Sequence, residues 1–551
     1  MSFHLSKLCA HRVSNLKLGK LWTNLIFIFF AILGFAIVSD YGVGFDEFVN
    51  RKNGSISFYY VNELINSILG VNSAQSDAAL INHSAILKSY QDRDYGVGFD
   101  LPAFAIERFL EINSPYWQHV LRHALTYCIF LAGCSAIFKT IRYYHNNFWL
   151  AVLSIIIFVL SPRIFGDAFH NSKDIVFMSA YAIATYLMIQ FFSISNFKTT
   201  LFFAIITAFA INLRIIGVIF LVATTIIFFL RLIRRYSRIE LANYSIYLAV
   251  SIALTIAFWP WLWANPIDNF IAAFLNMSKF RWDGWVLYLG DLYPVRQLPW
   301  HYLPVWIGVS TPIFYIFLFI VGTGAAIKSV CVNAIRLRLK MPALQDLIIL
   351  GLFFGPILLV LISKPVLYDG WRQFYFVYPA FVCLIIRGLS VALDSNRYRR
   401  TVHLLISVLG LFTITSTILW MIKAHPYQSV YLSPIVPKIN KPFFELDYWG
   451  LSNIELLRFL VRYQPKGLIS VAGLGITSLE QSLPLLSLDD RVRVQIAPDF
   501  SDATYVLTNY RLLDPSQRPI FNALSADWDS LFDIKVDGRT IASLFVRKAQ
   551  Q

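Results

Sequence analysis

Charged residues are scarce in this chain. Asp, Glu, Lys and Arg make up 14% of its 551 residues and apolar residues 57%, whereas soluble proteins have about 25% charged and ~45–50% apolar residues. A buried core cannot absorb this excess, so most of the chain must be solvated by lipid. The composition predicts a polytopic α-helical membrane protein and excludes a water-soluble one.

Cysteine is rare as well. None of the five cysteines lies in a predicted external loop, and Cys128, Cys134 and Cys383 lie in apolar runs, which excludes a disulfide framework. The sequence also lacks a Walker A motif, zinc-type Cys/His spacing and a G-x-S-x-G motif. These absences argue against a P-loop nucleotide site, a zinc site and a hydrolase nucleophile.

The apolar residues that are present gather in long runs. About eleven runs approach the ~20 residues that a spanning helix needs, near 21–39, 118–138, 148–161, 174–192, 199–213, 215–230, 244–262, 304–327, 345–363, 373–388 and 401–422. The net charge of +15 comes from short basic clusters between these runs. Such clusters are typical of a membrane surface rather than a nucleic-acid interface.

The basic residues also predict which ends of the spans face the cytoplasm. With the N-terminus inside, the inner segments contain 19 Lys and Arg, whereas the longer outer loops contain 13. This asymmetry predicts a cytoplasmic N-terminus, an uncleaved first span at 21–39 and an external chain after the last span. The basic loops at 231–243 and 328–344 are then cytoplasmic.

Two short runs, 199–213 and 215–230, meet at Arg214. Each would rise only ~23 Å as a helix, less than the ~30 Å of the hydrocarbon core. Helices that stop beneath a water-filled cavity would explain the charge between them. An arginine that reaches to the outer headgroups is the alternative, and the sequence leaves both open.

The chain after the last span has a different character. Residues 425–551 contain 13 of the 32 acidic residues and form a tail long enough to fold alone, so we divide the chain into a membrane domain, 1–422, and a small external α/β domain. Ser452 and Glu455 have the spacing of a capping box before a helix that runs to Tyr463. Strands are expected at 468–472, 491–496 and 503–508, and a hairpin at Asp537-Gly538 with 541–547.

The first external loop, residues 40–117, is unusually acidic. It contains ten acidic residues and five basic ones, and the heptapeptide DYGVGFD occurs in it twice, at 40–46 and 94–100. Each copy offers two carboxylates beside glycines that permit a tight fold. The functional interpretation is a site that needs carboxylates; the alternative is a set of solvated acids that merely balance charge.

These features resemble the GT-C membrane glycosyltransferases, in particular the protein O-mannosyltransferases and the lipid A aminoarabinose transferases. The Asp-Glu pair of the FDE sequence at 45–47, just after the first span, matches the motif whose aspartate is the catalytic base. The resemblance gives that role to Asp46, with Glu47 as its neighbour. The segment 161–175 is similar to the family's second external loop, where Asp174 takes the place of its acidic residue.

The resemblance implies an inverting hexosyl- or pentosyltransferase of a bacterial inner membrane. Its donor is a sugar on a polyprenyl phosphate, and its acceptor a lipid, glycan or protein outside. Such a donor already has an anionic leaving group, so the reaction needs one base and cations for the phosphate. External cations that fit this need are Arg163, His170, Lys173, Arg214, Lys364 and Arg372, with Arg372 and Lys173 first. The alternative for each is an anchor to lipid headgroups.

Several assignments remain open. Asp94 and Asp100 of the second heptapeptide are further candidates for substrate binding. Asp92-Arg93-Asp94 has the D-x-D form that can hold a divalent metal, but no metal ligand is assigned. The motifs YDGWRQF at 368–374 and FELDYWGLS at 444–452 receive no role. A transporter or flippase of lipid-linked saccharide is the alternative function, and a polysaccharide-binding assembly factor the third.

Overall fold

The computed structural model describes most of the chain, and all structural statements below concern that part. The described residues are 2–70, 83–232, 237–278, 281–335, 340–394, 399–437, 443–477, 479–512, 515–517, 521, 524 and 527–548. Parts of both predicted cytoplasmic basic loops, residues 233–236 and 336–339, lie outside it.

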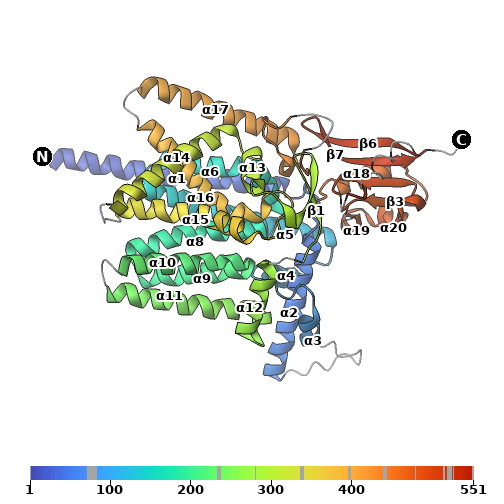
Figure 1. Ribbon diagram of the computed structural model, residues 1–551, viewed down its shortest axis with the longest axis horizontal. Helices are drawn as coiled ribbons and strands as arrows, with labels where there is room; N and C mark the ends of the chain where they lie inside the picture. Colours follow the sequence, from blue (N-terminus) through green and yellow to red (C-terminus); the bar gives the residue numbers. More distant parts are fainter. Residues whose placement is uncertain are drawn as a thin grey trace.

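A bundle of long apolar helices forms the larger part of the molecule (Figure 1). Among the described residues, eight helices are long and apolar enough to cross a membrane: α5 (Pro115–His145), α8 (Asp174–Ile194), η1 with α10 (Ile215–Leu232), α11 (Arg238–Ala257), α14 (Ile313–Ile335), α15 (Met341–Ser363), η4 with α16 (Arg372–Leu393) and α17 (Arg399–Ala424). Three further apolar segments are α1 (Ser2–Ile37), α9 (Phe197–Leu213) and the bent pair α6–α7. The predicted polytopic helical membrane fold is confirmed.

The run at 148–161 does not form one straight span. Helix α6 (Phe148–Val159) is followed by α7 (Pro162–His170) at an angle of 69°. Pro162 cannot donate the backbone hydrogen bond that would continue α6, and it keeps Ser161 in an extended conformation (φ −99°, ψ 101°). As a result α7 turns inward, where all nine of its residues are buried. The run at 304–327 is likewise broken, into α13 (Tyr302–Val309) and α14.

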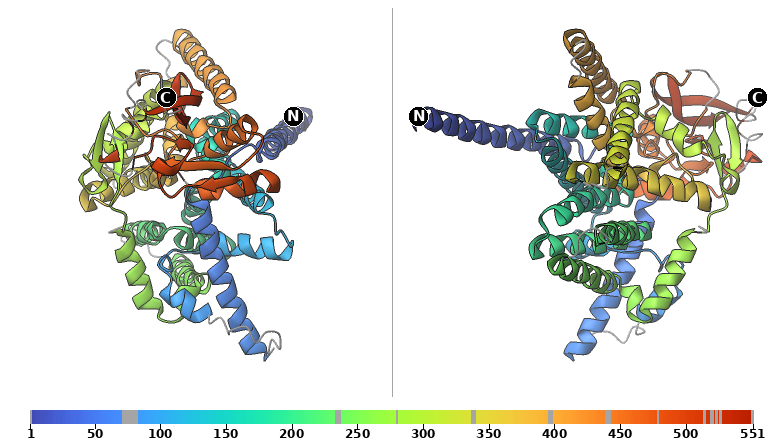
Figure 2. Two further views of the ribbon diagram at one scale, coloured as in Figure 1. Left: turned by 90° about the vertical axis from the view of Figure 1, so that its right-hand side faces the viewer. Right: turned by 60° about the vertical axis from the view of Figure 1, so that its left-hand side comes forward.

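Several shorter elements lie at one end of the bundle. Helix α2 (Glu47–Leu69) runs outward across that end (Figure 2), as does α12 (Pro266–Ser278). With them lie α3 (His83–Ser89), α4 (Asp100–Phe109) and the hairpin of β1 (Trp285–Tyr288) and β2 (Asp291–Pro294). The hairpin was not predicted from the sequence.

The C-terminal domain packs against the same end of the bundle (Figure 1). Its sheet has the order β4-β3-β5-β7-β6, in which β3 pairs parallel with β4 and β5, and β7 pairs antiparallel with β5 and β6. The strands are β3 (Ile469–Leu474), β4 (Val494–Ile496), β5 (Tyr505–Thr508), β6 (Trp528–Val536) and β7 (Arg539–Arg547). Trp420 and Leu446 pack against both the bundle core and the core of this domain.

The expected elements of the C-terminal domain are largely present. The hairpin turn lies at Asp537 and Gly538, both with positive φ, but α20 (Leu488–Arg493) occupies the first part of the strand expected at 491–496. Helix α18 (Asn453–Tyr463) begins after Ser452 as predicted, yet the capping box is wrong: Ser452 Oγ donates to Asp447. The remaining short helices are α19 (Leu479–Ser482), η2 (Pro260–Trp263), η3 (Val295–Gln297), η5 (Gln428–Val430), η6 (Leu483–Leu485) and η7 (Phe500–Asp502).

Candidate active site

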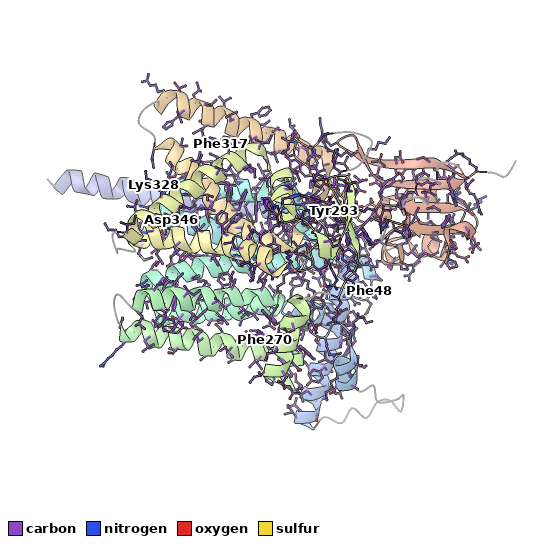
Figure 3. All side chains as sticks on the ribbon, viewed as in Figure 1. Phe48, Phe270, Tyr293, Phe317, Lys328 and Asp346 are labelled. Carbon is purple, nitrogen blue, oxygen red and sulfur yellow. The ribbon has the colours of Figure 1, made fainter. Side chains whose placement is uncertain are left out.

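Asp46 is the residue immediately before α2, at the end of the bundle that meets the C-terminal domain. Figure 3 places Phe48, two residues further along the chain, at this end and Asp346 at the opposite end. Aspartate at this position usually caps its helix, but Asp46 makes no side-chain cap hydrogen bond. Its Oδ2 instead accepts a hydrogen bond from Nη1 of Arg372 at 2.9 Å, and 33% of the side chain stays exposed. The carboxylate is therefore both paired and accessible.

Arg372 is the centre of the site. Its Nη2 donates to Asp369 Oδ2 at 2.9 Å, and its Nη1 lies 3.4 Å from Asp174 Oδ2 in addition to the contact with Asp46. The guanidinium also lies over the rings of Trp449, at 4.4 Å, and Tyr368, at 5.1 Å. Three carboxylates from distant parts of the chain thus converge on one buried arginine.

A sharp turn before η4 (Arg372–Val377) delivers this arginine. Asp369 and Gly370 have φ values of 56° and 72°, a left-handed conformation that glycine adopts readily and aspartate tolerates. Gly370 thus permits the bend. Trp371, the next residue, is buried and packs edge-on against Tyr375.

Asp174 begins α8, where a negative charge is favourable for the helix dipole. Its backbone N–H and its carboxylate are both fixed by the side chain of Asn171, at 2.9 and 3.0 Å. Oδ1 pairs with Arg214, the extended residue (φ −147°, ψ 130°) that ends α9. The two short runs do meet at Arg214, and this ion pair gives the arginine a partner inside the protein.

Lys173 completes the cluster. Its ammonium group lies 3.3 Å from the ring centre of Tyr95, in the second heptapeptide. Removal from water, together with the charge of Arg214, lowers the pKa of Lys173 to about 8. We call Asp46, Lys173, Asp174, Arg214, Asp369 and Arg372 the charge cluster.

Two carboxylates of the charge cluster, Asp46 and Asp369, lie outside the spans, and their pKa values shift in opposite directions. Burial alone would raise the pKa of Asp46, but the charges of Arg372, Lys173 and Arg511 outweigh it, and the pKa is lowered. Burial raises the pKa of Asp369 despite the charges of Arg511 and Arg372. Asp46 is thus an ionised carboxylate at neutral pH.

Glu47 lies beneath Asp46 and is fully enclosed. Its carboxylate accepts the backbone N–H of Gly44 at 2.7 Å and contacts His119 at 3.2 Å and His123 at 3.1 Å. Burial opposes ionisation, but the histidines lower the pKa of Glu47 well below its ordinary value. Its geometry supports a role in holding the Gly44–Asp46 turn rather than contact with a substrate.

Three predicted site residues contact other parts of the protein. Arg163 donates to the carbonyl of Tyr431 at 2.7 Å and lies over Trp306. Asp94 pairs with Arg281 and accepts from Asn276 at 2.9 Å, and Asp100 pairs with Arg122 at 3.2 Å. The cluster therefore gathers Asp46, Asp174, Lys173, Arg214 and Arg372, but not these three.

Sequence reasoning missed Asp369, Trp449 and Arg511. The first two lie in YDGWRQF and FELDYWGLS, the two motifs to which no role was assigned. Nη2 of Arg511, from the C-terminal domain, lies 2.6 Å from Asp369 Oδ1. A dense mixture of charged and aromatic residues near a turn was the signal in both motifs; Arg511 had no comparable signal.

The donor sets do not fit a metal ion. Among the described residues, no three or more His, Cys, Asp or Glu side chains are arranged to hold one. Within D-x-D, Asp94 is engaged by Arg281, and the three cluster carboxylates all face arginines. We therefore derive no step through a metal.

The charge cluster and Arg511 combine one accessible base with surplus positive charge. Three carboxylates face four cations, namely Lys173, Arg214, Arg372 and Arg511. An excess of at least one positive charge in a mostly buried site favours an anionic ligand. A phosphate group is the anion that guanidinium groups bind in bidentate fashion.

Known proteins show little sequence similarity to this chain. No protein-family model matches the chain, and no curated protein sequence matches it. The structure of ArnT from Cupriavidus metallidurans in the apo state is similar with a TM-score of 0.43 and 10% sequence identity, over 95% of this chain and 98% of that one. Similarity at this level assigns neither an activity nor the role of any residue to this chain.

Proposed function

We propose that the protein is an inverting glycosyltransferase that moves a sugar from a polyprenyl-phosphate donor to an acceptor hydroxyl on the external side of the membrane. The observation that carries the proposal is the contact between Asp46 and Arg372. It joins a partly exposed carboxylate to surplus cations at the end of a membrane-embedded bundle. A base next to an anion site is what transfer from a lipid phosphate requires.

In this proposal Asp46 accepts the proton of the acceptor hydroxyl. The acceptor oxygen attacks the anomeric carbon from the face opposite the phosphate, and the bond between that carbon and the phosphate oxygen breaks. The polyprenyl phosphate leaves with the bonding electrons. Arg372, Lys173 and Arg214 stabilise the negative charge that develops on the leaving oxygen, which removes the need for an acid.

The motif resemblance at Asp46 and Asp174 supports the same function. Both residues lie in the charge cluster, within reach of one arginine. A transporter of lipid-linked saccharide, the alternative, would instead use ionisable groups near the middle of the bilayer. The charge cluster instead lies where the loops predicted to be external meet the C-terminal domain.

Purified protein in detergent, mixed with a polyprenyl-phosphate-linked sugar and lipid acceptors, tests the proposal by release of polyprenyl phosphate. Asp46→Asn should lower release by about 10²–10⁴-fold while membrane insertion stays intact. Asp40→Asn is the matched control: Asp40 begins the same heptapeptide but is exposed and pairs with His425 at 2.8 Å. Near-normal release by Asp46→Asn would reject Asp46 as the base. Mass spectrometry of surface glycans and lipid-linked sugars in a deletion strain then identifies the sugar and acceptor.

A further inference from the structure

The C-terminal domain sends one arginine into the charge cluster. Arg511 follows β5, at the edge where the parallel strands β3 and β5 both end. The backbone N–H of Ile476, which follows β3, donates to the carbonyl of Arg511 at 2.8 Å. The carboxyl edge of a parallel sheet is where open α/β folds usually place functional loops, and here that edge faces the bundle.

The loop around Arg511 is fixed by Asn509. Its Oδ1 accepts the backbone N–H of Arg511 at 3.3 Å, and its Nδ2 donates to the carbonyls of Asp447 at 2.9 Å and Ile476 at 3.1 Å. Tyr510, between the two, has a positive φ of 59°. These constraints define the direction in which the Arg511 side chain leaves the domain.

The guanidinium of Arg511 divides its contacts between the two domains. Nη1 donates to the carbonyl of Tyr448 at 3.0 Å, while Nη2 lies 2.6 Å from Oδ1 of Asp369. The group also lies over the rings of Phe45, at 5.9 Å, and Trp282, at 6.0 Å. Only 6% of the residue is exposed, so its charge acts on the cluster with little screening by water.

Asp369 links this arginine to Arg372. Both hydrogen bonds from Arg372, at 2.9 and 3.2 Å, reach Oδ2 of Asp369, whereas Oδ1 faces Arg511. If Arg511 were removed, Oδ1 would also be available to Arg372. A bidentate pair would then draw Arg372 toward Asp369 and away from Asp46.

We infer that Arg511 is a positioning residue that holds Arg372 against Asp46 through Asp369, and that the C-terminal domain is thereby part of the active site. This inference deepens the proposed function and rests on it for its catalytic test. Glu445 lies near the same pair; burial and Asp369 raise its pKa to about 8. The raised pKa disfavours the ionised form of Glu445 beside Arg511.

A double-mutant cycle tests the inference through activity. Arg511→Ala should lower turnover about 10-fold, the low end for loss of a supporting residue, and Arg511→Lys should recover part of it. Because Arg511 acts through Asp369, Arg511→Ala should cost nothing further in an Asp369→Asn background. Losses that multiply in the double variant would show that Arg511 acts independently of Asp369 and would overturn the inference.

Hydrogen exchange provides a readout that needs no substrate. In Arg511→Ala, peptides spanning 365–378 in the membrane domain should exchange faster than in the unmodified protein. Arg493→Ala is the matched control, because Arg493 contacts only Asp490, Gln464 and Gly467 among the described residues. Unchanged exchange at 365–378 in Arg511→Ala would overturn the inference. If exchange were faster in Arg511→Ala but the unmodified protein had no transferase activity, the positioning role would be supported and only the proposed function would be refuted.

Discussion

The two copies of DYGVGFD, at 40–46 and 94–100, have the same sequence and the same local shape but different chemistry. Each ends where a helix begins, α2 after Asp46 and α4 at Asp100. In each, the first glycine lies against a backbone carbonyl. A Cβ on Gly42 would lie 2.3 Å from the oxygen of Leu451, and one on Gly96 2.0 Å from that of Asn212.

The last aspartates of the two copies differ in their partners. Asp46 faces Arg372 and stays one-third exposed, whereas Asp100 faces the buried Arg122 with 10% of its side chain exposed. The pKa of Asp46 is lowered by its cations, but burial raises that of Asp100 despite Arg122. The heptapeptide therefore determines a turn, and the tertiary partners determine whether its carboxylate can act as a base.

The prediction with the largest expected effect tests whether the last aspartates of the two copies differ in function. Asp46→Asn removes the base and should lower turnover by about 10²–10⁴-fold, the usual contribution of general base catalysis. Asp100→Asn should leave turnover within about threefold and instead lower the thermal midpoint, because a buried arginine loses part of its pairing. Turnover of polyprenyl phosphate and thermal unfolding in detergent measure both. Equal losses of turnover would mean that the copies share a role.

Substitutions of the two arginine partners, Arg372 and Arg122, should differ in the same way, one affecting turnover and the other stability. Arg372→Ala should lower turnover about 10²-fold, the scale of removing one electrostatic stabiliser, and Arg372→Lys less, because the charge remains without the planar fork. Arg122→Ala should mainly destabilise the protein. Full turnover of Arg372→Ala at saturating donor would make Arg372 a structural residue, and Lys173 with Arg214 would be tested next.

Alanine substitutions at Gly42 and Gly96 test whether the two copies depend on the same close backbone contact. Ala at either position forces a backbone carbonyl to move, at a cost of about 1–3 kcal/mol for overpacking. Gly42→Ala should loosen the C-terminal domain, seen as faster proteolysis between residues 425 and 437, and lower turnover about 10-fold through Arg511. Gly96→Ala should leave that cleavage unchanged. Identical proteolysis patterns would show that Gly42 does not control docking.

The smallest expected effect concerns a contact of the second copy with the charge cluster, the one between Tyr95 and Lys173. The pKa of Lys173 is lowered to about 8, so its positive charge is present below that pH and lost as the pH rises through it. The KM for the lipid-phosphate donor should therefore rise severalfold above pH 8. In Lys173→Arg, which stays charged, this rise should disappear; a persistent rise would assign it to another group.

Much of the fold follows from local patterns in the sequence. The apolar runs predicted the membrane segments, Asp537-Gly538 predicted a hairpin, and Ser452 predicted the start of a helix. The bend between α6 and α7 had its signal in Pro162, which the length of the apolar run concealed. These features depend on neighbours within a few residues, which is the range over which periodicity and turn chemistry act.

The site was predictable only in part, because its pairs are long-range. Family motifs identified Asp46 and Asp174, and chemistry identified Arg372 and Lys173, but nothing local indicates that Arg511 faces Asp369. Ser452 shows the same limitation, since its hydroxyl was expected to cap a helix and donates to Asp447 instead. Tertiary partners override local preference wherever a buried carboxylate needs a donor.

The separation of Asp46 and Arg372 by 326 positions has a consequence for biogenesis. The first loop emerges early in synthesis, yet the surfaces that hold its heptapeptide, Leu451 and the carbonyl of Trp449, emerge near the end. Since chains are made and fold from the N-terminus, Asp46 has no arginine partner until the later spans are inserted. A nascent or truncated chain can thus occupy the membrane without an assembled charge cluster, which forms only once the C-terminal domain has been made and has docked.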